Sequence, residues 1–471
     1  MACYVANHGR QDRTVVKSFA VFGAAIVVLG LLFTLVFQGE ALAQTAPILS
    51  ISDNATGGDC PVIGTWNPTA KTCTLTSDPN FRILIISDNI TLDGNGHSIT
   101  GNGEDLENDA ITVTGRTGVT VKNFILRNFN YGVHLVSSHG NTVTNNVSND
   151  NKAAGISLSH STGNTITGNT ISNETADTGI CIGYASSSNH LSANTITDAD
   201  RGIYLHDLSD GNNIMGNTFS RNLNALTLYD SDSNNSITGN VFTGNTMAIY
   251  LHRSSNSNIL RGNTISDNSY GLYMSDGASF NQVYQNAFIN NAIFQVSVNG
   301  GSGNSFSVAE PDGGNYWSSY DSAAEGCADV DADGYCDSAY GANGVIDSLA
   351  WVRNGGWTCT SPLLSLSRPV PFWATYADYM QHRLSISWTV NNDGNNTVYD
   401  VTVSGCMNTN GVMVETPLPS SLGNLAGGNS TSLTLAYSVP MGVGTFRSAI
   451  FLTANDRCEG AYEYPAPLPT A

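Results

Sequence analysis

The chain has 471 residues, and 18 Lys and Arg against 38 Asp and Glu give it a formal net charge of −20. This balance argues against nucleic-acid binding, because contacts to phosphates require clustered cations. Charged residues are 12% of the chain and apolar residues 41%, which argues against a highly charged disordered protein. The 48 Gly, with abundant Asn, Ser and Thr, indicate a fold rich in strands and turns.

The first 43 residues are typical of a signal peptide. Basic residues at positions 10, 13 and 17 precede an apolar run over residues 18–37, and Ala41-Leu42-Ala43 forms the small-residue pattern that signal peptidase recognises. Because the run is also long enough to span a bilayer, an uncleaved membrane anchor is the alternative. Cleavage is favoured. Either case predicts a secreted, periplasmic or cell-surface protein that meets a membrane only through this segment.

Eight cysteines follow residue 43, an even number in a compartment where disulfides persist. Their spacing favours three local pairs: Cys60 with Cys73, Cys327 with Cys336, and Cys406 with Cys458. Cys181 and Cys359 are left over, either free or joined to each other. Residues 44–82, closed by the first pair, are the expected N-terminal cap of the domain that follows.

A repeat of 23 or 24 residues occupies the centre of the chain, with copies that begin at residues 132, 155, 179, 202, 225, 248 and 271. Each copy has two apolar residues two positions apart, such as Ile203 and Leu205, and then two single apolar positions, such as Ile214 and Phe219. This spacing indicates three short strands and lacks the 3.6-residue stripe of a helix. We therefore expect an all-β parallel β-helix of about nine coils over residues 83–308, in which equivalent residues stack.

Asparagine recurs at two turn positions of the repeat. One column is Asn146, Asn169, Asn194, Asn217, Asn240, Asn263 and Asn286, and the other is Asn141, Asn164, Asn189, Asn212, Asn235, Asn258 and Asn281. Asn tolerates left-handed backbone angles and can bond its equivalents in neighbouring coils. These columns predict structural amide ladders.

Residues 92–99 (LDGNGHSI), the Gly-Asn-Thr-Ile coils and residues 313–320 (GGNYWSSY) resemble the NosD-type right-handed parallel β-helix proteins. The resemblance covers about residues 80–360 and implies a right-handed solenoid. It is specific for the fold and weakly informative about function, because this fold serves lyases, hydrolases, epimerases and plain binders. The family name refers to a periplasmic accessory protein of copper-dependent nitrous oxide reductase, so copper enters as an association with the family alone.

An Asp-rich loop follows the last repeat and matches the spacing of a calcium loop. Its expected ligands are Asp329, Asp331, Asp333, Asp337 and the carbonyl of Tyr335. Position 12 is Tyr340 where an EF-hand has Glu, so a further ligand is expected from Asp321, Glu325 or Asp347. We expect a structural Ca²⁺ within a C-terminal cap over residues 309–361. A solvated acidic turn is the alternative.

Residues that alternate with the inward positions of the first strand are expected to point outward. They and their neighbours include Tyr204, Tyr229, Tyr250, Tyr273, Asp276 and Arg253. Aromatic rings stack on sugars and carboxylates accept hydrogen bonds from hydroxyls, so this face is a candidate polysaccharide surface. The alternative is an ordinary β-surface on which Tyr is favoured and Asp maintains solubility.

A non-catalytic envelope protein that binds polysaccharide or another surface partner is the favoured function, because no complete catalytic set is evident. The second hypothesis is a lyase, hydrolase or epimerase that acts on uronic-acid polymers, with Tyr204, His206, Asp207, Asp230 and His252 as its candidate residues. Asp207 and Asp230 would lie about one strand spacing apart, near the ~5 Å of retaining glycosidases. A NosD-type copper role is third, because His206 and His252 are two coils apart.

The repeat stops at Pro362. Alternating apolar and polar residues over 384–390, 398–403, 432–439 and 446–453 predict a small antiparallel sandwich that extends over residues 362–471. It resembles the immunoglobulin-like modules of microbial surface proteins. This resemblance implies a role in adhesion, spacing or partner contact.

Overall fold

The computed structural model describes residues 47–103, 108–172, 178–310, 312–331, 333–357, 364–367, 370–394, 397–455 and 461–465. The predicted signal peptide lies outside these residues. Strands dominate, and the described helices are the short α1 (Cys60–Ile63), α2 (Tyr376–Met380) and the 3₁₀ turn η1 (Ala323–Glu325). No helix in this part of the chain is long and apolar enough to cross a membrane.

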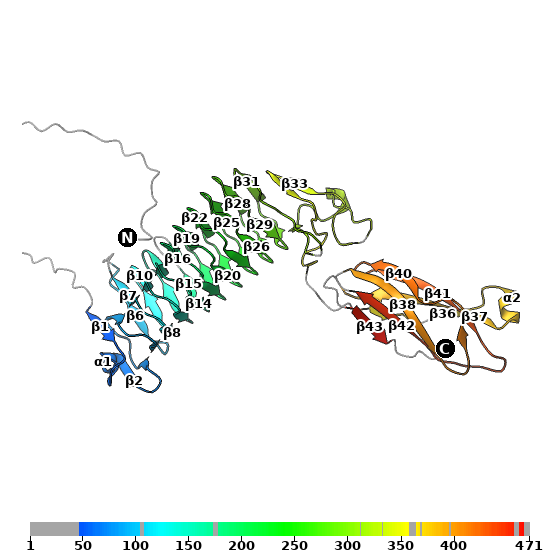
Figure 1. Cartoon of the computed structure of the whole chain (residues 1–471), viewed down its shortest axis with the longest axis horizontal. Coiled ribbons are helices and arrows are strands. Elements are labelled where there is room, and N and C mark those ends of the chain that lie inside the picture. The colour runs from blue at the N-terminus through cyan, green and yellow to red at the C-terminus, as the bar shows by residue number, and fades with distance from the viewer. Residues whose placement is uncertain are drawn as a thin grey trace, which may run out of the picture. The chain divides into compact units, whose positions relative to one another are not determined.

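Three ladders of strands form the predicted solenoid (Figure 1). In the order of their pairing, the first sheet contains β1 (Ile48–Ile51), β4 (Arg82–Ile85), β7 (Asp109–Thr114), β10 (Tyr131–Val136), β13 (Ala154–Ser159), β16 (Thr178–Gly183), β19 (Arg201–His206), β22 (Asn224–Tyr229), β25 (Met247–His252), β28 (Tyr270–Ser275) and β31 (Phe294–Asn299). These strands carry the outer face on which the candidate site lies.

The other two sheets complete each coil. The second contains β2 (Gly64–Asn67), β3 (Thr72–Leu75), β5 (Thr91–Asp93), β8 (Thr120–Lys122), β11 (Thr142–Thr144), β14 (Thr165–Thr167), β17 (His190–Ser192), β20 (Asn213–Met215), β23 (Ser236–Thr238), β26 (Ile259–Arg261) and β29 (Gln282–Tyr284). The third contains β6 (Ser98–Thr100), β9 (Ile125–Arg127), β12 (Val147–Asn149), β15 (Thr170–Ser172), β18 (Thr195–Thr197), β21 (Thr218–Ser220), β24 (Val241–Thr243), β27 (Thr264–Ser266), β30 (Ala287–Ile289) and β32 (Tyr316–Trp317).

The chain divides into two compact units, residues 1–187 with 197–204, and residues 188–196 with 205–471. In the first unit β10 pairs in parallel with β13, and Val133 lies opposite Ile156. In the second unit β25 pairs in parallel with β28, and Ile249 lies opposite Leu272. These paired residues are at most 1% exposed, so the predicted inward positions are confirmed.

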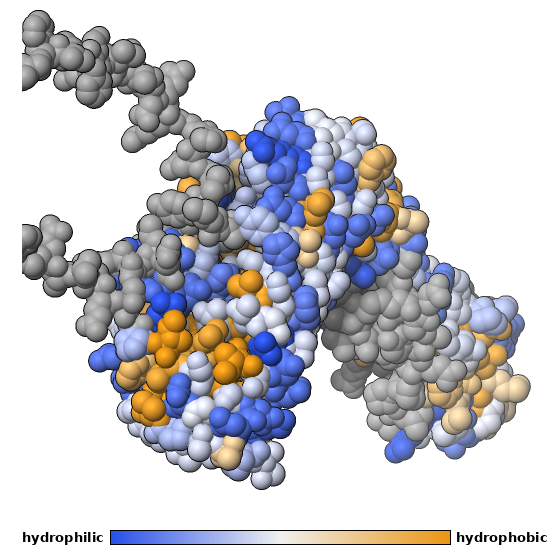
Figure 2. Space-filling model, turned by 60° about the vertical axis from the view of Figure 1, so that its left-hand side comes forward, coloured by the Kyte–Doolittle hydropathy of each residue, from blue (hydrophilic) through white to orange (hydrophobic). Residues whose placement is uncertain are grey.

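The solenoid has about ten turns, close to the predicted nine. The difference arises at the N-terminal end, where the expected cap contributes strands of its own. There β1 pairs in parallel with β4, and β3 pairs in parallel with β5. The predicted disulfide between Cys60 and Cys73 is formed in this segment. Figure 2 shows hydrophilic residues over much of the visible surface, with apolar side chains gathered in patches.

The predicted asparagine ladders are present. Asn217 donates from its backbone N and its Nδ2 to Asn240 Oδ1, at 2.9 and 3.0 Å. Asn240 donates in the same way to Asn263 Oδ1. The Nδ2 of Asn240 also lies 2.8 Å from the carbonyl of Ile214. Both hydrogens of each amide are therefore used inside the turn, and this satisfies polar groups that are almost completely buried.

A hairpin of β33 (Tyr340–Ala342) and β34 (Val345–Asp347) follows the last coils. The ring of Tyr340 stacks on that of Trp317 with 4.2 Å between centroids. The predicted disulfide between Cys327 and Cys336 is formed nearby. Cys181 is buried in β16 and is disulfide-bonded, which excludes the free thiol; Cys359 as its partner stays a prediction, because Cys359 lies outside the described residues.

The C-terminal region consists of two antiparallel sheets around one core. The first contains β35 (Leu364–Leu366), β36 (Val370–Phe372), β37 (Arg383–Asn392), β39 (Met413–Val414) and β41 (Ser430–Ser438), and the second contains β38 (Val398–Asn408), β40 (Ser420–Leu425), β42 (Ser448–Asn455) and β43 (Ala461–Pro465). Trp388, Val403 and Leu452 are among the buried core residues. Assignment of this region to the immunoglobulin-like class stays a prediction.

The expected disulfide between Cys406 and Cys458 is corrected. Cys406 is a free thiol, and its Sγ faces an interior polar cluster, 3.4 Å from Ser448 Oγ and 3.9 Å from the Tyr437 hydroxyl. Cys458 lies outside the described residues. The sulfur is therefore occupied by weak hydrogen bonds within the module.

Candidate functional site

Aromatic side chains form two adjacent columns on the outer face of the first sheet, within the second unit. The strand register places Tyr250 beside Tyr273 and Tyr229 beside His252. The rings of Tyr250 and Tyr273 stack at 5.3 Å with 19° between their planes, and those of Tyr229 and His252 lie 5.2 Å apart. All four rings are half-buried. We refer to the two pairs together as the aromatic column.

His252 is at the centre of a polar network. Its Nδ1 lies 2.8 Å from Ser275 Oγ, 2.9 Å from the Tyr250 hydroxyl and 3.3 Å from Asp276 Oδ2. Burial lowers the pKa of His252, and the nearby carboxylate of Asp276 opposes this shift only in part. Burial also raises the pKa of Tyr250. At neutral pH the column therefore presents a neutral imidazole and a protonated phenol.

Charged groups flank the aromatic column. The guanidinium of Arg253 lies over the ring of Tyr229, 4.6 Å from its centroid, in a cation–π arrangement. The Asp276 side chain is 64% exposed and free to accept hydrogen bonds from a ligand. The column thus combines apolar ring surface with a carboxylate acceptor at its edge.

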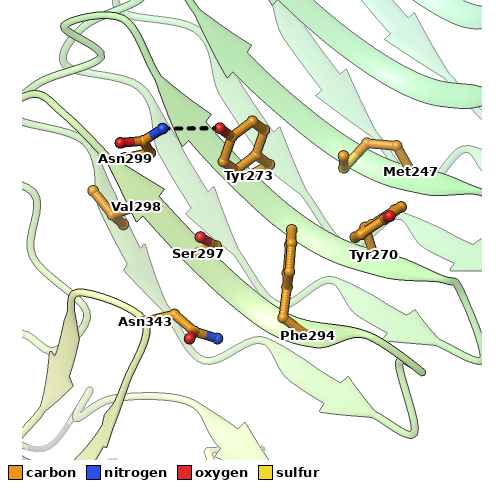
Figure 3. A pocket seen from close by; sticks show the side chains of 8 residues that line it. All are labelled: Met247, Tyr270, Tyr273, Phe294, Ser297, Val298, Asn299 and Asn343. Atoms are coloured by element: carbon orange, nitrogen blue, oxygen red, sulfur yellow. Dashed lines mark hydrogen bonds between the residues drawn. The ribbon is translucent and has the colours of Figure 1, made fainter.

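A groove of about 700 Å³ continues the column onto β31 (Figure 3). It is lined by Met247, Tyr270, Tyr273, Phe294, Ser297, Val298, Asn299 and Asn343. The first seven come from β25, β28 and β31, whereas Asn343 comes from the turn between β33 and β34. Asn299 Nδ2 donates to the Tyr273 hydroxyl at 3.3 Å, the bond drawn in Figure 3. This volume is within the usual range of about 300–1,000 Å³ for small-molecule sites.

Two predicted surface residues are not exposed. Tyr204 is 8% exposed and His206 is 5% exposed, although both alternate with core residues along β19. The guanidinium of Arg201 lies 4.6 Å from the Tyr204 ring centroid, and Asp207 Oδ2 lies 3.0 Å from His206 Nδ1. The expectation that Tyr204 belongs to an open binding surface is therefore wrong, and His206, a candidate catalytic residue, is likewise almost completely buried.

The candidate carboxylates Asp207 and Asp230 lie at equivalent turns, directly after β19 and β22. Both have left-handed backbone angles, with φ of 54° and 70°. The Asp207 side chain is 45% exposed and paired with His206. Their joint role in catalysis stays a prediction.

The acidic loop brings three of its predicted ligands together. One carboxylate oxygen from each of Asp329, Asp331 and Asp333 lies within 4.8 Å of the others. Asp329 Oδ1 is buried and has no hydrogen-bond partner, whereas Oδ2 accepts from the Gly334 N at 3.1 Å. Burial and, in lesser part, the charges of Asp333 and Asp331 raise the pKa of Asp329. An all-oxygen set of this kind suits a hard cation such as Ca²⁺.

The other carboxylates expected near the ion accept hydrogen bonds from the protein, and their role as calcium ligands stays a prediction. Asp337 Oδ2 accepts from the Val330 N at 3.0 Å. Glu325 Oε2 accepts from the Asp321 N at 3.1 Å, and Asp321 accepts from the Tyr316 hydroxyl. No described contact tests the carbonyl of Tyr335 as a ligand.

Asp347 is not available as the missing ligand. Its Oδ2 accepts from the Asn315 N at 2.7 Å and from Trp317 Nε1 at 2.9 Å, and its Oδ1 accepts from the Leu349 N at 3.2 Å. The side chain is fully buried, and burial raises its pKa to about 6. Asp347 is therefore a structural acceptor.

Sequence reasoning missed the residues of the groove beyond Tyr273. Phe294, Ser297 and Asn299 could have been found by extending the outward-facing columns onto the last predicted coil, because Tyr273 pairs with Ser297 and Ser275 with Asn299. Asn343 carries no such signal, since it reaches the groove from a hairpin outside the repeat.

Residues 109–265 match the family described as right handed beta helix region, and residues 222–322 match the family described as periplasmic copper-binding protein (NosD). The solenoid is a NosD-like right-handed β-helix. A comparison with curated proteins found no match.

Several solved structures resemble this NosD-like chain in fold. The periplasmic alginate epimerase AlgG is 14% identical over 50% of this chain and 72% of its own, with a TM-score of 0.38. The A-module of the mannuronan C-5 epimerase AlgE6 from Azotobacter vinelandii is 12% identical over 57% of this chain and 81% of its own, with a TM-score of 0.33. The catalytic domain of a GH87 alpha-1,3-glucanase is 16% identical over 58% and 64%, with a TM-score of 0.28. At these identities the likeness concerns the fold alone.

The name of the NosD family raises the question of copper. Among the described residues, the one group of three or more His, Cys, Asp or Glu side chains close enough to hold a metal is Asp329, Asp331 and Asp333. Copper sites favour imidazole, thiolate or thioether ligands, which this group lacks. The described metal-ligating side chains therefore do not fit copper.

Proposed function

We propose that this NosD-like protein is exported and binds a polysaccharide, without catalysis, on the outer face of β22, β25, β28 and β31. The observation that carries the proposal is the aromatic column, whose half-buried rings continue into a groove lined by ring faces, amides and a hydroxyl. Rings supply apolar surface for sugar C–H groups, and polar side chains at the edge supply hydrogen bonds.

Binding of the full chain to an array of bacterial and plant glycans tests this function. Tyr250→Ala and Tyr273→Ala should weaken capture, because each removes a ring from the column. Phe280→Ala is the matched control, since Phe280 is a 62% exposed aromatic residue that does not line the groove. Absence of binding to every glycan, or equal binding by all variants, would contradict the proposal.

The proposal includes a structural calcium ion in the cap. Asp329, Asp331 and Asp333 supply three convergent oxygens, and the buried Asp329 Oδ1 lacks any other partner. A bound cation would offset the mutual repulsion of these carboxylates. The ion would hold the loop next to the Cys327–Cys336 disulfide and take no part in ligand chemistry.

An enzyme acting on uronic-acid polymers is the second candidate, supported by His252. A neutral imidazole 2.9 Å from a phenol and 3.3 Å from a carboxylate has the composition of an acid–base pair. Incubation with alginate or pectate, followed by analysis of chain length and of unsaturated ends, tests for turnover. Under this view the double variant Asp207→Asn, Asp230→Asn abolishes turnover with little change in stability. A wild-type protein that leaves both polymers intact would exclude it.

A further inference from the structure

We propose that the groove at the end of the aromatic column binds uncharged sugar residues and discriminates against uronic acids. This inference rests on the proposed polysaccharide-binding function and names the ligand class. It is carried by three observations: where ring faces are open, which polar groups line the groove, and where the nearest charges lie.

Ring faces become available where the stack of Tyr250 and Tyr273 ends. Along the column the face of Tyr250 is covered, because Tyr273 stacks on it with 19° between the planes. At the next step the stack is broken. Phe294 is tilted by 44° from Tyr273 at 6.0 Å and by 51° from Tyr270 at 4.9 Å. Because Phe294 is tilted against both tyrosines, it does not cover their ring faces as a parallel ring would, and a sugar ring can lie against this aromatic surface in the groove (Figure 3).

The polar groups in the groove are neutral. Ser297 contributes a hydroxyl, Asn299 an amide, and Asn343 a second amide. Asn343 is held in place, because its Nδ2 donates to the Val296 carbonyl at 3.2 Å and its own carbonyl accepts from the Val298 N at 3.0 Å. The Oδ1 of Asn343 is thereby left for a ligand. Hydroxyl and amide groups of this kind match the donor and acceptor pattern of sugar hydroxyls.

Among the residues that the structure describes, no cation lines the groove to neutralise a uronate. None of the eight described residues that line the groove is charged. Across residues 224–299 there are two basic residues, Arg253 and Arg261, against four Asp. Arg253 lies over Tyr229, and Arg261 is bonded to Gln285 and paired with Asp312.

An exposed acidic side chain at the end of β28 strengthens the discrimination. Asp276 follows β28 directly and exposes 64% of its side chain. A ligand carboxylate would find no cationic partner among the lining residues, and the negative charge of Asp276 just beyond β28 would disfavour it further, because like charges brought together at an interface are unfavourable. The formal net charge of −20 adds a weaker repulsion of polyanions at a distance.

Isothermal titration of the full chain tests the inference with two oligosaccharide sets of matched length. One set is uncharged, from cellulose, xylan and mannan, and the other is built of uronic acids, from alginate and pectate. We expect binding of a member of the uncharged set, about tenfold weaker in Phe294→Ala and Tyr273→Ala, and unchanged in Phe280→Ala. Ser297→Lys should raise uronate affinity, since it adds the missing cation at the groove without removing a ring.

The outcomes separate the inference from the function on which it rests. Tighter binding of uronates than of uncharged chains, lost in the groove variants, would overturn the ligand class while leaving polysaccharide binding intact. Uncharged binding that Phe294→Ala and Ser297→Lys both leave unchanged would overturn the groove as the site. No binding of either set would overturn both. Melting temperatures of the variants identify any loss of affinity that arises from misfolding.

Discussion

A single acidic residue, Asp232, interrupts a column of serines inside the turns. In the coils before and after it, the hydroxyls of Ser209 and Ser255 each donate to a backbone carbonyl three residues earlier. Asp232 accepts instead, from the Ser209 N at 2.8 Å and the Tyr229 N at 2.9 Å. Burial raises the pKa of Asp232 to about 8, and the charges of Asp210 and Asp207 add to the shift.

We predict that Asp232→Ser stabilises the protein most at alkaline pH. Between the ordinary value of 3.8 and about 8, folded Asp232 holds a proton that the unfolded chain has released. The free energy of unfolding therefore falls as pH rises through this window, by at most about 1.4 kcal/mol per pH unit. A serine at this position would supply the same neutral hydroxyl as Ser209 and Ser255. The free energy of unfolding would then no longer fall with pH on account of this residue.

Thermal unfolding across this pH window measures the effect. The melting temperature of Asp232→Ser should exceed that of the wild type by an amount that grows toward pH 8. Asp267→Asn, which removes an exposed charge from a neighbouring coil, should show no such growth. Parallel pH profiles for wild type and Asp232→Ser would refute the assignment.

At the scale of structural elements, the asparagine ladder joins each coil to the next by hydrogen bonds. We predict that Asn240→Ala lowers the free energy of unfolding by about 2–4 kcal/mol, because it strands the Asn217 amide N and the Ile214 carbonyl in a buried turn. Denaturant unfolding measures the loss. The control is Thr246→Ala on an exposed turn of the same coil, which should change stability little. A similar small change in both variants would show that the ladder is energetically neutral.

The acidic loop makes a second prediction at this scale. Calcium at about 100 times its dissociation constant should stabilise the full chain by about 2.7 kcal/mol, because it binds the folded loop alone. A chelator should therefore lower the melting temperature. Asp331→Asn should abolish the response, whereas Asp312→Asn, a change outside the cluster, should retain it. A chelator without effect on the wild type would leave the loop as a solvated turn.

At the scale of the whole molecule, stability is distributed over nearly equal coils that contact their neighbours. We predict that deletion of residues 225–247, one complete repeat, leaves a folded protein, because Asn224 then joins Ala248 with every column in register. Deletion of residues 225–235 should prevent folding, since it joins Asn224 directly to Ser236, the first residue of β23, and so removes the first-sheet strand of this coil. Circular dichroism and the yield of soluble protein compare the two. Equal yields would show that register is not the constraint.

The sequence was sufficient to predict the solenoid, because the same inward apolar positions recur at a constant period in every coil. Ile203 and Leu205 were correctly placed inside, since strand alternation decides their direction. The same rule gave the direction of Tyr204 and His206 but not their exposure, which depends on neighbours such as Arg201 and Asp207.

Sites built by more than one kind of element were harder to predict. Asn343 enters the groove from a hairpin that follows no repeat. Asp347 was one of three candidates for the further calcium ligand, although four N–H groups hold its carboxylate. Spacing identified the convergent Asp329, Asp331 and Asp333, because they belong to one short loop. Contacts between distant segments leave no comparable pattern in a single sequence.

The role of Asp347 has a consequence for self-assembly. In the amide ladder the backbone N and the Nδ2 of each asparagine donate to the next coil. Each asparagine therefore requires an acceptor in the coil that follows. The last of them, Asn315, finds a carboxylate, which accepts from its N and Nδ2 and has no hydrogen to hand on. The relay of this column is thereby terminated within one polypeptide, and its last asparagine leaves no unpaired amide on which another molecule could template end-to-end filament growth.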